Sequence, residues 1–535
     1  MLCRERLGST EAHNGVPDTG EHAGGVEPQR RVAALTLRSA HMPSGERSQQ
    51  MLSILVGHSY FLRLDPKQLE RAKPYPPLAT LQVASMLRRA GHQVALFDAM
   101  LSAGIAEYAH QLAAMKPQLV LLYEDNFNFL SKMCLDRMRR ASCEMIALAR
   151  RCGARVVVAG ADASDAPEPY LRAGADLVLL GEGLATLAVL QQRLDDSPDA
   201  TPAVLAAGLA GIALLLEGTL SSTARARAPV AAEPDELPAW DLVDVERYRR
   251  TWLEAHGHFS LNMAASRGCS FRCAWCAKPI WGNQYLQRKP AAVAREMAHL
   301  KRAFRPDHIW FADDIFGFRV DWVSEFARAL HAEDGGIPFT IQTRADLLSE
   351  RMALALREAG CREAWIGAES GSQRVLDAMN KGTTVAEILT ARARLKAVGI
   401  KVGFFIQLGY LGEELPDILA TRDLLDRALP DDVGVSVSYP LPGTRFHELV
   451  RAQLGPKTHW RDSGDLAMMF HGTYTSEFYR AIRDLLHERV SLETLNAPAQ
   501  AAQYRHGQHL LERRWDDLLS SERDHRNEVS RATAG

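Results

Sequence analysis

The sequence lacks several features that would place it in a broad class at once. No apolar stretch approaches the ~20 residues that a bilayer-spanning helix needs, so no membrane span is expected. The formal net charge is only −2 and no basic run stands out, which argues against nucleic acid as a partner. Only 8 of the 535 residues are cysteine, and no secretory signal is recognisable, which disfavours a disulfide-stabilised secreted protein. These absences favour a cytoplasmic protein.

Residues 1–50 have the composition of a disordered extension. They are rich in Gly, Glu, Arg, Ser and Pro and show neither helical nor strand periodicity. A buried-strand pattern begins directly after Met51, which leads to the hypothesis that Met51 is the natural start. The intact mass of the protein made from its native gene tests this, because a product that carries residues 1–50 would refute it.

The densest chemical signal is a group of three cysteines after a strand-like run. Cys269, Cys273 and Cys276 lie within Arg267-Gly-Cys-Ser-Phe-Arg-Cys-Ala-Trp-Cys276. Three thiolates this close can hold one metal centre, and a cubane iron–sulfur cluster held by only three of them keeps one iron open to a further ligand. A structural zinc site would need a fourth Cys or His at a suitable spacing, and none follows.

This triplet resembles the signature of the radical S-adenosylmethionine superfamily, C-x3-C-x-aromatic-C, with Trp275 at the aromatic position. The resemblance implies a 4Fe–4S cluster on the three cysteines and S-adenosylmethionine at the open iron. It also implies an electron donor such as flavodoxin or ferredoxin.

A second cluster is not expected. Cys134, Cys143 and Cys152 recur every nine residues, but on the helix predicted over residues 134–151 their thiols alternate between opposite sides. The outer two would be ~27 Å apart. The methylthiotransferases of the same superfamily need a second three-cysteine cluster, so that class is disfavoured.

Residues 51–200 predict a doubly wound α/β domain. Short, fully apolar strands alternate with helical patterns, which is typical of a parallel sheet covered on both faces, with its ligand beyond the carboxyl ends of the strands. No G-x-G-x-x-G follows the first strand, so a dinucleotide is disfavoured. The expected strands are 52–56, 93–97, 118–123, 155–159 and 176–180, and the expected helices lie near 77–90, 103–115, 134–151, 167–173 and 184–194.

This segment resembles the Rossmann-like cobalamin-binding domain that precedes many radical S-adenosylmethionine domains. The shared pieces are Pro76-Pro-Leu78, Gly91-His92, Ala159-Gly160 and Gly181-Glu-Gly183. The resemblance implies that Gly160, Gly181 and Glu182 contact cobalamin. Small residues at strand ends let the backbone approach a corrin closely.

The histidine that binds cobalt in many cobalamin proteins has no clear counterpart. The motif D-x-H-x-x-G is absent, and His58, which follows the first strand, lacks the flanking Asp and Gly. His58 is therefore a candidate cobalt ligand, with a polar loop residue as the plainer interpretation. Cobalt without a protein ligand on its lower face is the expected state.

Three further regions complete the domain organisation. Residues 201–250 are expected to be a linker, with a hairpin-like stretch at 211–220. Residues 251–455 predict a partial (β/α)6 barrel with its site at the carboxyl ends of the strands. Residues 456–535 are expected to form a C-terminal helical cap and tail, with a packing appendage as the alternative to a cap over the barrel mouth. The expected barrel strands are 259–264, 308–312, 339–342, 363–367, 401–408 and 434–439.

Polar residues crowd the ends of these barrel strands. By the resemblance, Asp313 or Asp314 holds the methionine amino group, Glu369 and Ser370 the ribose, and Trp275 the adenine. Arg344 would pair with the methionine carboxylate or with the substrate. The plainer interpretation of each is a strand-end residue that caps the next helix, as Ser and Asp often do.

The family also tends to carry a Gly-Pro-Gly-Glu segment after the fifth barrel strand. Here Gly409-Tyr-Leu-Gly-Glu413 is one residue longer and has no proline. Adenine contacts from this loop are therefore in question.

The resemblance implies an enzyme that methylates an unactivated carbon of a small molecule or of a lipid or sugar metabolite, through a 5′-deoxyadenosyl radical and methylcobalamin. Relatives with the same two domains also catalyse cyclisation or oxidation, and the motifs do not separate these outcomes. A non-catalytic cobalamin carrier is a third class, but it would have no use for the three cysteines.

Overall fold

The computed structural model describes residues 51–128, 136–226, 236–276, 283–455, 468–493 and 501–527. The predicted disordered extension 1–50 and Cys134 lie outside the described residues. In the described part, no helix is both long enough and apolar enough to cross a bilayer.

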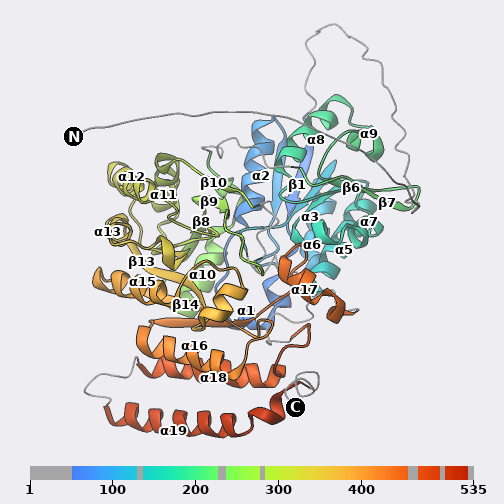
Figure 1. The fold of residues 1–535 in the computed structure, drawn as a ribbon. Coiled ribbons are helices and arrows are strands. Elements are labelled where there is room, and N and C mark those ends of the chain that lie inside the picture. Colours follow the sequence, from blue (N-terminus) through green and yellow to red (C-terminus); the bar gives the residue numbers. More distant parts are fainter. Residues whose placement is uncertain are drawn as a thin grey trace, which may run out of the picture. The chain divides into compact units, whose positions relative to one another are not determined.

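The first sheet has seven strands in the order β2-β1-β3-β4-β5-β6-β7, and β1 to β5 run parallel (Figure 1). This order places β1 between β2 and β3, which creates the topological switch point where ligands bind in doubly wound sheets. The five predicted strands are confirmed. They are β1 Ser53–Gly57, β2 Gln93–Phe97, β3 Leu119–Tyr123, β4 Arg155–Ala159 and β5 Leu177–Leu179.

Both faces of this sheet are buried, as its apolar strands require. Alternate residues of β1 point to opposite faces, Ile54 and Val56 to one core and Leu55 to the other. The expected helices are all present. They are α2 Leu78–Arg89 and α8 Leu184–Asp196 on the first face, and α3 Ile105–Met115, α5 Asp136–Arg151 and α7 Pro167–Arg172 on the second.

The predicted hairpin forms and extends this sheet beyond residue 200. It consists of β6 Ile212–Leu216 and β7 Thr219–Ser222, and β6 pairs antiparallel with β5. Glu217 and Gly218 between the strands both have positive φ, 50° and 79°, as a two-residue type I′ turn requires.

The second sheet is the predicted six-stranded parallel barrel wall, in the order β15-β14-β13-β12-β11-β8. Helices between the strands cover its outer face (Figure 1). The strands are β8 Ser260–Met263, β11 His308–Phe311, β12 Phe339–Thr343, β13 Cys361–Glu369, β14 Lys401–Leu408 and β15 Asp432–Val437. The helices that follow in sequence include α11 Pro290–Phe304, α12 Val320–Ala332, α13 Glu350–Ala359, α14 Gln373–Ala378, α15 Val385–Ala397, α16 Leu415–Ala428 and α17 Arg445–Leu454.

A small antiparallel pair, which the sequence did not predict, frames the three-cysteine loop. It joins β9 Ser266–Gly268 to β10 Tyr285–Gln287. Each strand is three residues long, too short for a periodic signal.

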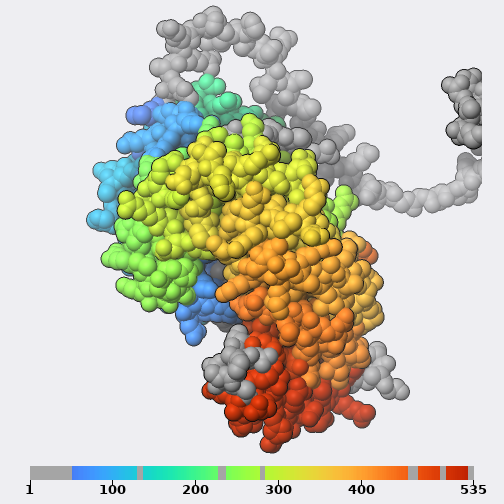
Figure 2. Space-filling view, turned by 90° about the vertical axis from the view of Figure 1, so that its left-hand side faces the viewer, coloured from blue at the N-terminus to red at the C-terminus, as the bar shows by residue number. Residues whose placement is uncertain are grey.

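The two edges of the barrel sheet are covered by different parts of the chain. On β8, Asn262 Nδ2 donates to Pro76 O at 3.0 Å, so the Pro-Pro-Leu segment of the first domain contacts the barrel. On β15, α18 Ser476–Glu493 packs along the strand, and α19 Ala501–Ser520 packs on α18 (Figure 1). Figure 2 shows these C-terminal residues in red, next to the orange part of the barrel. Covered edges cannot pair with strands of another chain.

Candidate functional site

The three-cysteine loop lies at the carboxyl edge of the barrel and is fastened by its backbone. Ala274 N donates to Met379 O at 2.8 Å, and Phe446 N donates to Ala274 O at 2.9 Å. Cys269 is buried, whereas Cys273 and Cys276 are partly exposed. The loop is thus held by the residue after α14 and by the first turn of α17.

Arg344, at the end of β12, lies beneath this loop. Its Nη1 is 3.6 Å from Cys273 Sγ, and its guanidinium lies 3.7 Å from the centroid of the Phe271 ring. Asp346 accepts from its Nε and Nη2 at 2.9 and 3.0 Å, and Lys381 O accepts from Nη2 at 2.7 Å. The positive charge of a buried arginine thus lies beside a thiol of the loop.

These surroundings fit the expected cluster. Three thiols share one fastened loop, and an arginine lies beside one of them. Within the described ranges no three His, Cys, Asp or Glu side chains are placed to hold a single ion. A 4Fe–4S cluster does not need its three thiolates on one ion, because each thiolate binds a separate iron.

Asp313, at the end of β11, fixes the start of the same loop. Its buried carboxylate accepts from Ala265 N at 2.9 Å and from the hydroxyl of Ser266, the first residue of β9. Burial raises the pKa of Asp313 to about 7. The neighbouring Asp314 is partly buried.

Glu369, at the end of β13, pairs with a lysine that the sequence did not single out. Lys381 Nζ lies 2.7 Å from Glu369 Oε1, and both side chains are only 5% exposed. Glu369 has φ +61° at a register shift between β13 and β14, so the strand bends where its carboxylate turns inward. A Cβ on Gly367 would lie 2.6 Å from both charged atoms, so glycine there makes room for the pair.

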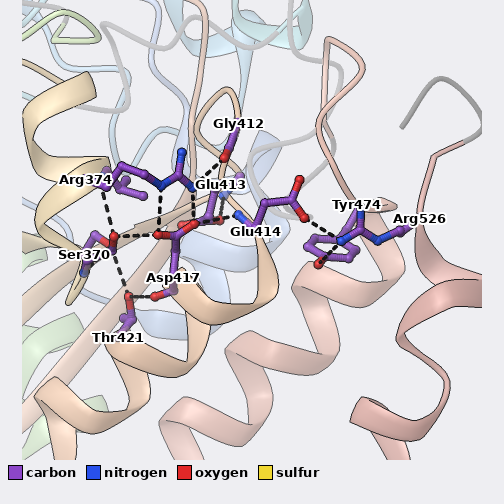
Figure 3. A network of polar contacts seen from close by, with 12 residues as sticks. Ser370, Arg374, Gly412, Glu413, Glu414, Asp417, Thr421, Tyr474 and Arg526 are labelled. Carbon is purple, nitrogen blue, oxygen red and sulfur yellow. Dashed lines mark hydrogen bonds and ion pairs between the residues drawn. The ribbon is translucent and has the colours of Figure 1, made fainter. Parts of the chain in front are cut away.

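Ser370 belongs to a buried polar network at the start of α16 (Figure 3). Its hydroxyl is 3.2 Å from Thr421 Oγ1, and it accepts from Ser372 N at 3.1 Å. Ser372 caps α14 and donates to Asp417 at 2.6 Å, and Asp417 pairs with Arg374. Ser372 thus caps the next helix, and Ser370 holds the backbone of that cap.

Glu413 closes the loop in which the sequence departs from the family. Its Oε2 accepts from Gly409 N, and Gly409 has φ +73°. Its Oε1 has no hydrogen-bond partner among the described residues. Burial, with the nearby Asp417 carboxylate, raises the pKa of Glu413 to about 8. The loop is therefore shaped by its own glutamate, without the proline of the family segment.

In the first domain, the predicted residues gather at the carboxyl ends of the strands. His58, after β1, is buried, and its Nε2 is 3.0 Å from Asp98 Oδ1 after β2 and 3.1 Å from Ala99 N. Burial disfavours the charged ring, but the carboxylates of Asp98, Glu124 and Asp125 outweigh it and raise the pKa of His58. The Nε2 atom is thus engaged by the protein.

Gly160 and Gly181 are linked through one serine. Ser164 Oγ donates to Gly160 O at 2.6 Å and accepts from Gly181 N at 2.9 Å. A Cβ on Gly160 would lie 2.8 Å from Glu124 Cγ, so the close approach requires glycine. The turns after β4 and β5 therefore form one unit.

Glu182 points away from this unit toward the barrel. Its carboxylate forms an ion pair with Arg267 of β9, and the two side chains are 9% and 6% exposed. The pair joins the first domain to the strand that leads into Cys269.

The predicted residues thus fall into two groups, one at the strand ends of the first domain and one at the strand ends of the barrel. The second group surrounds the cysteine loop. Arg344 contacts the cysteine loop directly, Asp313 holds the strand that leads into it, and Glu369 and Ser370 lie at the next strand end. Trp275, in the loop itself, packs partly buried against the core, and its Nε1 has no hydrogen-bond partner in the described part of the chain.

Sequence reasoning missed Lys381, Arg267 and Asn126. Asn126 lies after β3 at the switch point, is fully buried, and has neither amide atom hydrogen-bonded within the described residues. Unpaired buried amides are costly, so this one suits a ligand. The polar run Glu124-Asp-Asn126 after a fully apolar strand could have indicated it.

Comparisons with known proteins agree with this geometry. Residues 263–425 match the model of the Radical SAM superfamily. An uncharacterized methyltransferase of Pyrococcus horikoshii is 24% identical over 380 residues, which cover 70% of this chain and 78% of that protein. The hopanoid C-3 methylase of Methylococcus capsulatus is 25% identical over 421 residues, 75% of this chain and 72% of that protein.

A solved structure shares both parts of the fold. The cobalamin-dependent S-adenosylmethionine radical enzyme OxsB, with aqua-cobalamin and S-adenosylmethionine bound, aligns with a TM-score of 0.65 at 16% identity. The alignment covers 88% of this chain and 72% of that one. The predicted Rossmann-like sheet followed by a partial barrel is confirmed. Residues 263–425 thus form a radical S-adenosylmethionine domain, which indicates a radical S-adenosylmethionine enzyme, and the chain shares the two-part fold of OxsB.

Proposed function

We propose that this enzyme transfers a methyl group to an unactivated carbon of a small-molecule, lipid or sugar substrate. The observation that carries the proposal is the joining of the two sheets: a three-cysteine loop on the barrel rim is tied to the glycine turn after β5 by the Glu182–Arg267 ion pair. The similarity to proteins named as methyltransferases supports the choice of reaction.

Three cofactors fit the residues present. Cys269, Cys273 and Cys276 would hold a 4Fe–4S cluster, and the strand ends around Asp313, Arg344, Glu369, Ser370 and Trp275 would hold S-adenosylmethionine. The turns at Gly160 and Gly181 and the buried residues after β1 and β3 would hold cobalamin. When bound, these groups supply a 5′-deoxyadenosyl radical and a transferable methyl group, and the protein supplies position and exclusion of water.

Arg344 and Asp313 would act by holding the cysteine loop. Arg344 ties Cys273 to Lys381 O, and Asp313 ties residues 265–266 to the end of β11. Lys381 Nζ pairs with Glu369 Oε1, so a contact with the ribose would use the other carboxylate oxygen of Glu369. Reduction of the cluster would come from a protein donor such as flavodoxin or ferredoxin, in the reducing cytoplasm.

We infer that His58 would not serve as a cobalt ligand when cobalamin is bound. The engagement of His58 Nε2 with Asp98 and Ala99 supports this, because that nitrogen would have to leave both partners to reach a metal. The absorption spectrum of bound cobalamin in His58→Ala is expected to equal that of the wild type.

The experiment is anaerobic purification with cluster reconstitution, followed by iron, sulfide and cobalt analysis with added cobalamin. Near four iron and one cobalt per chain are expected. Cys273→Ala should lose most of the iron, whereas Cys143→Ala, on α5 of the first domain, is the matched control and should keep it. Iron without cobalt would refute the methyl-transfer proposal.

Cyclisation or oxidation is the alternative outcome on the same cofactors. S-adenosylmethionine with a deuterated methyl group separates the two once a substrate is turned over. A product without the label would rule out methyl transfer.

A further inference from the structure

The Glu182–Arg267 ion pair spans the two cofactor regions and belongs to neither alone. Glu182 lies in the Gly181–Gly183 turn after β5, and Arg267 lies in β9, two residues before Cys269. Both side chains are more than nine-tenths buried, so water screens their attraction poorly and the pair resists separation.

In the first domain, Glu182 belongs to a turn that is fixed by hydrogen bonds. Tyr123 OH donates to Glu182 O at 2.7 Å, and Ser164 Oγ accepts from Gly181 N at 2.9 Å. Gly181 and Gly183 have φ +79° and +77°, and a Cβ on Gly183 would lie 2.8 Å from Leu179 Cβ. The position of Glu182 therefore follows the turn that would face the corrin.

On the barrel side, the guanidinium stands next to the cluster loop. Arg267 pairs with Leu286 across the β9–β10 ladder, and the preceding Ser266 donates to Asp313. Gly268 follows with φ +76°, and then Cys269. A shift of Arg267 would thus move the first cysteine of the loop.

We propose that the Glu182–Arg267 pair is a positioning device that couples cobalamin binding to the stability of the cluster. The pair fixes the distance between the turn after β5 and the three-cysteine loop. When cobalamin binds and holds that turn in place, the loop that holds the cluster is held in place as well. This coupling rests on the proposed function, because it needs both cofactors on this chain. By thermodynamic linkage, each cofactor then strengthens binding of the other.

The test uses cluster-loaded protein and measures the rate at which a ferrous chelator removes iron, with and without saturating hydroxocobalamin. In the wild type, cobalamin should slow iron loss by about five-fold or more, at the lower end of typical coupling. In Glu182→Gln the two rates should agree within about two-fold, well below the range of typical coupling. Arg267→Lys keeps the charge and should retain part of the protection.

Two controls separate positioning from folding. The double variant Glu182→Leu/Arg267→Met removes both buried charges, so neither charge is left buried without a partner. This variant should fold, but cobalamin should no longer slow its loss of iron. Asp241→Asn removes an exposed ion pair with Arg88 of α2 and should keep the wild-type ratio. The magnetic interaction between reduced cluster and cob(II)alamin should report a wider spread of separations in Glu182→Gln.

The outcomes are distinct. Full protection in Glu182→Gln, or no protection in a wild type that binds hydroxocobalamin, would overturn the coupling and leave the proposed function intact. A wild type that binds no hydroxocobalamin would overturn the cobalamin part of the proposed function, and the coupling with it.

Discussion

Replacing Glu413 by Gln should stabilise the folded chain above neutral pH. The Glu413 side chain is 1% exposed, and its Oε2 accepts from Gly409 N. Burial raises the pKa of this carboxyl to about 8, from its ordinary value of 4.5. The folded chain therefore keeps a proton that the unfolded chain loses between these two values.

The sign and size follow from proton linkage. Between the two pKa values the folded state binds more protons, so the free energy of unfolding falls as pH rises, by at most ~1.4 kcal/mol per pH unit. From pH 6 to pH 8 the loss amounts to ~2–3 kcal/mol in the wild type. Glutamine is neutral at both values, and its carbonyl can still accept from Gly409 N, so the variant escapes the loss.

The assay is thermal unfolding of wild type and Glu413→Gln at pH 6 and pH 8, without added cofactors. The gap in melting temperature should widen by several degrees in favour of the variant at pH 8, since ~1 kcal/mol corresponds to ~2–4 °C in domains of ordinary size. Glu414→Gln is the matched control, because it removes a partly exposed neighbouring carboxylate that pairs with Arg526, worth at most ~1 kcal/mol. A gap that is equal at the two pH values would refute the raised pKa.

Two further predictions concern packing around the barrel rim. Gly371→Ala should destabilise the chain severely, because its Cβ would lie 2.1 Å from Ala420 O, whereas Gly336→Ala, with nothing within 4 Å, should leave the melting temperature unchanged within about a degree. Lys381→Met should cost ~3–5 kcal/mol by leaving the buried Glu369 carboxylate unpaired, and the double variant Glu369→Gln/Lys381→Met should recover most of that loss in a denaturant titration. Equal stability of the single and double variants would contradict the buried pairing.

Features encoded by neighbouring residues could be predicted from the sequence. The strands were visible because each is a short apolar run bounded by polar residues, as in Leu119–Tyr123. The three cysteines share one loop because they are close in the chain. The polar residues after β11, β12 and β13 reach one edge because parallel strands end on the same side.

Contacts between distant segments could not be predicted in this way. The pairing of Glu182 with Arg267, and of Glu369 with Lys381, is decided by how loops meet, and a charged residue gives no sign of its partner. The hairpin at 212–222 was visible as a hairpin, but its pairing with β5 depends on which sheet edge is free. For the same reason the C-terminal helices gave no sign that α18 would cover β15.

The pairing of charged groups at the rim bears on how this enzyme would select its substrate. Arg344, Asp313 and Lys381 use their polar atoms to hold the cysteine loop and the strand ends in place. Substitutions at these positions should therefore disturb cofactor retention before they alter substrate choice. Residues that change substrate choice without loss of iron should instead be sought among side chains that hold neither the cysteine loop nor the strand ends. Positioning a loop and recognising a substrate place different demands on a residue.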